Sequence, residues 1–136
     1  MLVWVFLLSA LVTSAAFVMD IKLAIFDLDG TLLDTETLST KAIEMVLEEI
    51  GVSGFDWALK KKLLGLRGPD WSAIVIDEMQ IEGKISPEAM VNQWESNLGQ
   101  LCPSVEKMSG ADTLTARFES SGLRMAIATS SSSAQV

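Results

Sequence analysis

Two carboxylates, Asp27 and Asp29, form the segment of this sequence best suited to chemistry. They directly follow the short apolar run at residues 21–26 and precede Gly30 and Thr31. A carboxylate at the end of a strand can attack phosphorus and form an acyl phosphate. A second carboxylate on the next turn can protonate the leaving oxygen and then activate water. The pattern therefore predicts Asp27 as nucleophile and Asp29 as general acid and base; the alternative is an acidic turn in which Asp29 only caps a helix.

A second group of polar residues follows the later apolar run at residues 123–128. Thr129 and Ser130 would stand at the end of that strand, where hydroxyls and free amides can bind a phosphate oxygen. The alternative for so serine-rich a stretch is an ordinary polar loop. Two carboxylates that face a phosphate also need a counter-charge, which implies a divalent cation such as Mg²⁺.

Composition narrows the remaining possibilities. The 136 residues carry 10 Lys and Arg against 18 Asp and Glu, so the formal net charge is −8. An acidic chain without a basic run repels a phosphate backbone, which argues against nucleic-acid binding. The absence of His excludes a Ser-His-Asp triad and histidine metal ligation. The single Cys102 excludes an intrachain disulfide and a cysteine-cluster zinc site.

The elements that must position these side chains can be predicted from apolar spacing and from helix caps. The apolar runs at residues 21–27 and 123–129 are typical of buried parallel strands. Asp56 and Ser86 are expected to cap helices, and Gly51 to end one. Helices are expected at residues 38–50, 56–62, 69–79, 86–98 and 111–118. This order indicates a helical module inserted after the first strand of an α/β fold.

The string from Phe26 to Thr35, with the later Ala-Thr-Ser-Ser, resembles the haloacid dehalogenase superfamily in its phosphatase and phosphomutase branch. Asp27 and Asp29 match motif I of that family, and Thr129 matches the Ser/Thr of motif II. The stretches DGTLLDTE and GLRMAIATSS resemble pseudouridine-5′-phosphatase, glycerol-phosphatase and beta-phosphoglucomutase-like members. The resemblance covers nearly all of residues 21–136.

The resemblance implies an α/β fold with a Rossmann-type parallel-sheet core and an inserted four-helix cap. The core would comprise residues 19–34 and 108–136, and the cap residues 35–107. It implies Mg²⁺-dependent hydrolysis of a small phosphorylated metabolite (a sugar phosphate, glycerol phosphate or nucleotide-like compound) through an aspartyl-phosphate intermediate. A phosphomutase, which returns the phosphoryl group to a sugar, is the alternative enzyme.

The resemblance also implies roles for individual residues. Asp27 would be the nucleophile and a metal ligand, and Asp29 the general acid and base, with its backbone carbonyl on the Mg²⁺. Thr129 and Ser130 would bind the phosphoryl group, and Arg67, in a cap loop, would contact the substrate. A solvated surface arginine is the alternative for Arg67.

Other side chains in the helical segment are given structural interpretations. The lysines at residues 60–62 are expected on a solvated helix face. Trp57, Trp71 and Trp94 lie at helical spacing with aliphatic residues and are expected in the core of the helices.

The two ends of the sequence carry further expectations. No residue matches the Lys of motif III or the acidic motif IV, so the core is expected to be incomplete, with two strands, and the activity impaired. A catalytically inactive fragment is the non-enzymatic alternative. Residues 1–18 are apolar and uncharged. They are interpreted as a targeting segment or a gene-model extension, and as a membrane anchor only if they are retained. The protein would be cytoplasmic if Met19 is the start, and secretory or organellar if residues 1–16 are a signal peptide.

Overall fold

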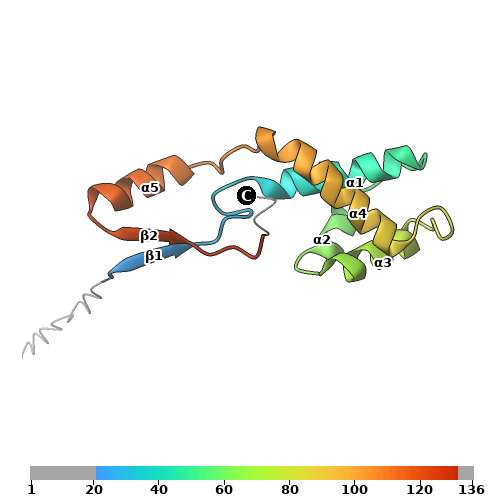
Figure 1. The fold of residues 1–136 in the computed structure, drawn as a ribbon, viewed down its shortest axis with the longest axis horizontal. Coiled ribbons are helices and arrows are strands. Elements are labelled where there is room, and N and C mark those ends of the chain that lie inside the picture. The colour runs from blue at the N-terminus through green and yellow to red at the C-terminus, as the bar shows by residue number, and fades with distance from the viewer. Residues whose placement is uncertain (1–20, 132–136) are drawn as a thin grey trace, which may run out of the picture.

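The computed structural model describes residues 21–131, so the apolar segment at residues 1–18 lies outside the described residues. The molecule is elongated, with the two strands and α5 at one end and α1–α4 at the other (Figure 1). The predicted α/β class is confirmed, with four α-helices between the first strand and α5. The elements are β1 (Leu23–Phe26), α1 (Thr35–Glu49), α2 (Trp57–Leu63), α3 (Gly68–Glu78), α4 (Pro87–Leu101), the 3₁₀ helix η1 (Cys102–Ser104), α5 (Ala111–Ser120) and β2 (Arg124–Ile127).

The helices begin where side chains can satisfy their free amide groups. Asp34 accepts a hydrogen bond from the amide of Thr37 at the start of α1, at 3.2 Å. Asp56 caps α2, and Ser86 caps α4 ahead of its Pro, as predicted. An N-cap acceptor replaces a hydrogen bond that the first turn of a helix cannot make within itself.

The hydrophobic core lies among α1–α4. Val46, Val75 and Met90 are fully buried there, and α1 packs against α4 along the helical module. Trp71 is buried and Trp94 packs against this core, as predicted. Trp57 is a correction, since its side chain is 65% exposed. It is the first residue of α2 and faces solvent, so helical spacing alone did not identify its neighbours.

β1 and β2 form a two-stranded parallel sheet in which Leu23 pairs with Arg124 and Phe26 with Ile127. The helix α5 packs against this sheet, and the rings of Phe26 and Phe118 lie 5.8 Å apart. The expectation of buried strands is wrong, since Ile127 is 58% exposed and every residue of β2 is exposed. Parallel sheets are usually covered by helices on both faces. Within residues 21–131, only α5 packs against this sheet.

Two chain segments connect the sheet to the helices, and they are hydrogen-bonded to each other. The amide of Asp34 donates to the carbonyl of Glu106 at 2.8 Å, and the amide of Met108 donates to the carbonyl of Leu32 at 2.9 Å. These bonds hold the loop after β1 against the segment that leads into α5. The loop that carries the two carboxylates is therefore fixed by hydrogen bonds to the segment that follows the helical module.

None of the helices in residues 21–131 has both the length and the apolar character that crossing a membrane requires.

Candidate active site

Asp27 and Asp29 lie at the carboxyl end of β1, where open α/β sheets place their ligands. Asp27 directly follows the strand and is exposed, and its Oδ1 accepts a hydrogen bond from the amide of Leu28 at 2.9 Å. Asp29 is half-buried on the turn that follows. Gly30 has a φ of +67°, a left-handed conformation that glycine adopts without steric cost, and its amide donates to the carbonyl of Leu33. This turn directs Asp29 toward the end of β2.

The carboxylate of Asp29 is held by two hydroxyl groups from the end of β2. Thr129 Oγ1 donates to Asp29 Oδ2 at 3.0 Å, and Ser131 Oγ donates to the same oxygen at 2.6 Å. The amide of Ser131 in turn donates to Thr129 Oγ1 at 3.0 Å. Parallel strands end at the same edge of a sheet, and their pairing brings these polar ends together. The sequence predicted Thr129 and Ser130 as the phosphate-binding residues of this edge; in the structure the second hydroxyl on Asp29 comes from Ser131, the next residue of the same stretch.

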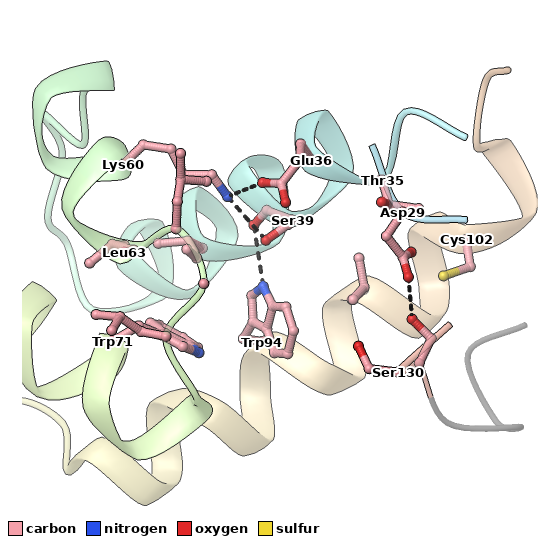
Figure 2. A pocket seen from close by; sticks show the side chains of 16 residues that line it. Asp29, Thr35, Glu36, Ser39, Lys60, Leu63, Trp71, Trp94, Cys102 and Ser130 are labelled. Atoms are coloured by element: carbon pink, nitrogen blue, oxygen red, sulfur yellow. Dashed lines mark hydrogen bonds and ion pairs between the residues drawn. The ribbon is translucent and has the colours of Figure 1, made fainter. Parts of the chain in front are cut away.

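A pocket of about 320 Å³ lies between this end of the sheet and the helices (Figure 2). Asp29, Ser130 and Ser131 line it on the sheet side, and residues of α1–α4 and of the loop between α2 and α3 line the other walls. The walls combine polar groups with aromatic ones, since Trp71 and Trp94 both line the pocket with their rings 5.5 Å apart. A concave site that combines polar groups with apolar and aromatic walls is typical of small-ligand binding.

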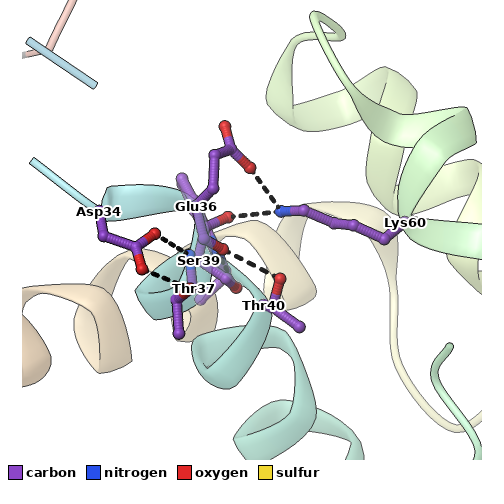
Figure 3. A network of polar contacts seen from close by, with 7 residues as sticks. Asp34, Glu36, Thr37, Ser39, Thr40 and Lys60 are labelled. Atoms are coloured by element: carbon purple, nitrogen blue, oxygen red, sulfur yellow. Dashed lines mark hydrogen bonds and ion pairs between the residues drawn. The ribbon is translucent and has the colours of Figure 1, made fainter. Parts of the chain in front are cut away.

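Lys60 contributes the positive charge on the helical side of the pocket. Its Nζ lies 3.0 Å from Glu36 Oε2 and donates to Ser39 Oγ at 3.2 Å (Figure 3). The indole of Trp94 donates to the carbonyl of Ser39 at 3.3 Å, so one residue of α1 connects α2 and α4. The expectation that the lysines at residues 60–62 form a solvated face is wrong for Lys60, which is 5% exposed. Lysine is rarely so buried unless it is paired, and here Glu36 supplies the partner.

Arg67 lies directly before α3 and is exposed. The neighbouring Gly65 and Leu66 line the pocket, whereas Arg67 is absent from its lining among the described residues. The structure therefore brings Asp29, Ser130 and Lys60 to one pocket, whereas Asp27, Thr129 and Arg67 are outside its lining as residues 21–131 form it.

The oxygen atoms near Asp27 are of the type that Mg²⁺ prefers. Mg²⁺ commonly binds through one or two carboxylates and completes its shell with water and substrate phosphate oxygens. The exposed carboxylate of Asp27 and the backbone carbonyl of Asp29 fit such a limited protein contribution. No cluster of three or more His, Cys, Asp or Glu residues suited to a metal ion occurs in residues 21–131, so these residues do not form an all-protein metal cage.

Comparison with known proteins connects this geometry to a family. The sequence profile of haloacid dehalogenase-like hydrolases matches residues 24–136. The chain belongs to this family. The haloacid dehalogenase-like chain is 36% identical over 105 residues to (DL)-glycerol-3-phosphatase 1 of Arabidopsis thaliana, covering 77% of its own length and 35% of that protein. It is 31% identical over 107 residues to the Drosophila melanogaster protein named probable pseudouridine-5′-phosphatase, covering 79% and 45% of the two chains.

The haloacid dehalogenase-like fold is also found among solved structures. A predicted phosphoglycolate phosphatase from Haemophilus somnus superposes with a TM-score of 0.68 at 18% identity, over 88% of this chain and 56% of that one. CbbY from Rhodobacter sphaeroides, solved with xylulose-1,5-bisphosphate, gives a TM-score of 0.64 at 24% identity, over 85% and 54% of the two chains. The chain therefore spans about half the length of these structural relatives and less than half of the curated relatives above.

Proposed function

We propose that Asp27 and Asp29 serve the Mg²⁺-dependent hydrolysis of a small phosphomonoester through a phosphorylated Asp27. One observation carries this proposal. The carboxylate of Asp29 is bonded to the hydroxyls of Thr129 and Ser131 at the carboxyl edge of a parallel sheet, beside the exposed Asp27 and on the wall of a pocket. Carboxylates and hydroxyls at such an edge can together bind and transfer a phosphoryl group.

In the first step, a carboxylate oxygen of Asp27 attacks phosphorus and forms the new oxygen–phosphorus bond. The bond between phosphorus and the leaving oxygen breaks, and Asp29 donates a proton to that oxygen. In the second step, Asp29 accepts a proton from water as the water oxygen attacks the same phosphorus. The bond between Asp27 and phosphorus then breaks, which releases inorganic phosphate and restores Asp27 as a carboxylate and Asp29 in its protonated form.

Thr129 and Ser131 would change hydrogen-bond partners when substrate binds. Both hydroxyls donate to Asp29 Oδ2 in the structure. A phosphoryl oxygen of the substrate carries more negative charge than a carboxylate oxygen and attracts the same hydroxyl donors. If a hydroxyl donates its hydrogen bond to the phosphoryl group instead, Asp29 Oδ2 is free to face the leaving oxygen. The two hydroxyls would therefore hold Asp29 in place before binding and hold the phosphoryl group after it.

Mg²⁺ would be held by the carboxylate of Asp27 and the backbone carbonyl of Asp29. When bound, it supplies positive charge that offsets the repulsion between the phosphoryl oxygens and the attacking carboxylate.

The substrate would be a small phosphorylated metabolite. The pocket of about 320 Å³ is at the small end of the range for ligand sites. Relatives named for glycerol 3-phosphate and pseudouridine 5′-phosphate support a compact leaving group that carries hydroxyls.

Trifluoroberyllate, which binds aspartate as a mimic of a phosphoryl group, tests the proposal without requiring turnover. We expect the full chain with Mg²⁺ and beryllium fluoride to give bound ¹⁹F resonances that Asp27→Asn abolishes. The matched control is Asp112→Asn, because Asp112 is exposed on α5, away from the pocket lining. Bound resonances that persist in Asp27→Asn, or release of phosphate from glycerol 3-phosphate that survives this substitution, would contradict the proposal.

A further inference from the structure

The wall of the pocket that faces the sheet contains an ion pair between a buried lysine and an exposed glutamate, which the proposed chemistry does not use. Lys60 and Glu36 line the pocket together with Ser39, whereas Asp29 and Ser130 lie on its other side (Figure 2). The two partners differ in access, since the side chain of Lys60 is 6% exposed and that of Glu36 is 56% exposed. The ammonium group is therefore shielded, and the carboxylate remains open.

Stability alone gives little reason for this pair. An ion pair with an exposed partner contributes little to stability, because water screens the exposed charge. Lys62, two residues further along the same helix, offers a comparison, because it pairs with Glu78 at 2.6 Å with both side chains exposed. That pair lies outside the pocket lining. Only the Lys60–Glu36 pair, of these two, can meet a bound ligand.

The balance of charge in the pocket favours one class of ligand. Its lining contains the carboxylates of Asp29 and Glu36 and the ammonium group of Lys60. Glu36 already offsets the charge of Lys60, so the lining, as residues 21–131 form it, has no further cation to offset a second anionic group on the substrate. Neutral hydroxyls of a ligand can hydrogen-bond to these lining residues, because a hydroxyl can donate to Glu36 and accept from Lys60 or Ser39.

We propose that the Lys60–Glu36 pair determines the specificity for the leaving group. It selects a neutral polyol with two neighbouring hydroxyls and rejects a leaving group that carries a carboxylate. One hydroxyl would donate to Glu36 and its neighbour would accept from Lys60. This inference rests on the proposed function, since it assigns the leaving group of a phosphomonoester bound at Asp27 and Asp29.

The test measures binding to the full chain with Mg²⁺, by the ¹⁵N shifts of backbone amides and tryptophan indoles. Glycerol 3-phosphate, 2-phosphoglycolate and inorganic phosphate are the probes. We expect glycerol 3-phosphate to bind at least about tenfold more tightly than 2-phosphoglycolate, since an unpaired charge in a confined site costs that much or more. The indole of Trp94, bonded to Ser39, should respond to glycerol 3-phosphate.

Two substitutions examine the pair directly. Glu36→Gln leaves Lys60 without a counter-charge, and we expect the preference for glycerol 3-phosphate to fall by about tenfold or to reverse. Lys60→Met should lower the affinity for glycerol 3-phosphate by about tenfold and leave the affinity for inorganic phosphate unchanged. The matched controls Glu78→Gln and Lys62→Met, in the exposed pair, should leave the preference unchanged. Glu36→Gln carries the test by itself if Lys60→Met does not fold, because Glu36 is the more exposed partner.

The outcomes separate this inference from the proposed function. A preference that Glu36→Gln leaves unchanged, with inorganic phosphate still bound, overturns the role of the pair and leaves the proposed function intact. Failure of inorganic phosphate to bind the unsubstituted chain overturns the proposed function, and the specificity inference with it.

Discussion

Asp29 and Thr129 are separated by 100 residues in the sequence, and a hydrogen bond of 3.0 Å joins their side chains. The carboxylate belongs to the loop after β1, and the hydroxyl follows β2. The bond therefore closes the gap between the ends of the two strands and connects the two segments that the proposed chemistry requires. Loss of the Thr129 hydroxyl should therefore affect phosphate binding.

Replacing Thr129 by Val removes the hydroxyl and keeps the branched shape of the side chain. We expect the affinity for inorganic phosphate to fall about tenfold or more, because a hydrogen bond to a charged group contributes about 1.5–3 kcal/mol. Titration calorimetry with Mg²⁺ present measures this change. Thr129→Ser should restore binding, and Thr113→Val, at an exposed position of α5, should not alter it. Equal affinities in the Thr129→Val and unsubstituted chains would refute the role of the hydroxyl.

Gly30 and Gly99 should respond to alanine with opposite signs. Gly30 has a φ of +67°, so Gly30→Ala should lower the free energy of unfolding by about 1 kcal/mol or more. A Cβ at Gly30 would lie 3.6 Å from Glu36 Cγ, an ordinary contact, so the cost is conformational. Gly99 lies inside α4 with open space around it, and Gly99→Ala should stabilise by about 1 kcal/mol. Thermal unfolding followed by circular dichroism measures both, and a destabilised Gly99→Ala would count against this assignment.

The core of the helices should dominate stability over the sheet. Met90 is fully buried, and we expect Met90→Ala to lower the free energy of unfolding by about 3 kcal/mol. Ile127 in β2 is largely exposed, so Ile127→Ala should cost about 1 kcal/mol or less. Urea unfolding of the two variants gives the comparison. Equal losses would show that Ile127 is buried against something in solution.

Asp56 stabilises the helix that carries Lys60. Its Oδ1 accepts from the amide of Leu59 at 2.8 Å, and Asp56→Ala should cost about 1 kcal/mol. Asp77, exposed near the carboxyl end of α3, provides the control. Asp77→Ala should be neutral or slightly stabilising, because a negative charge is unfavourable at that end of a helix. Urea unfolding reports both changes, and equal destabilisation by the two substitutions would argue against the cap.

The helices and the site edge could be predicted because their signals are local. Asp56 and Ser86 begin helices through hydrogen bonds to amides three residues later, which a sequence displays directly. The apolar spacing of α1 likewise predicts its buried face, including Val46 and Leu47. The position of Asp29 near Thr129 followed from a general property of parallel strands.

The features that could not be predicted depend on distant partners. Lys60 lies within a run of three lysines, and the residues that bury and pair it, such as Ser39, come from another helix. The exposure of Ile127 depends on what packs against the sheet, which its own sequence does not specify. Trp57 has the spacing of a core residue and faces solvent, because its helix begins at that position.

The pairing of β1 with β2 also has a consequence for synthesis. Every helix of the described chain lies between these strands, so α1–α4 emerge from the ribosome before β2 does. A nascent polypeptide can therefore complete its helical bundle first, since domains assemble as units while translation proceeds. The carboxylates of the first strand emerge early and acquire their hydroxyl partners last.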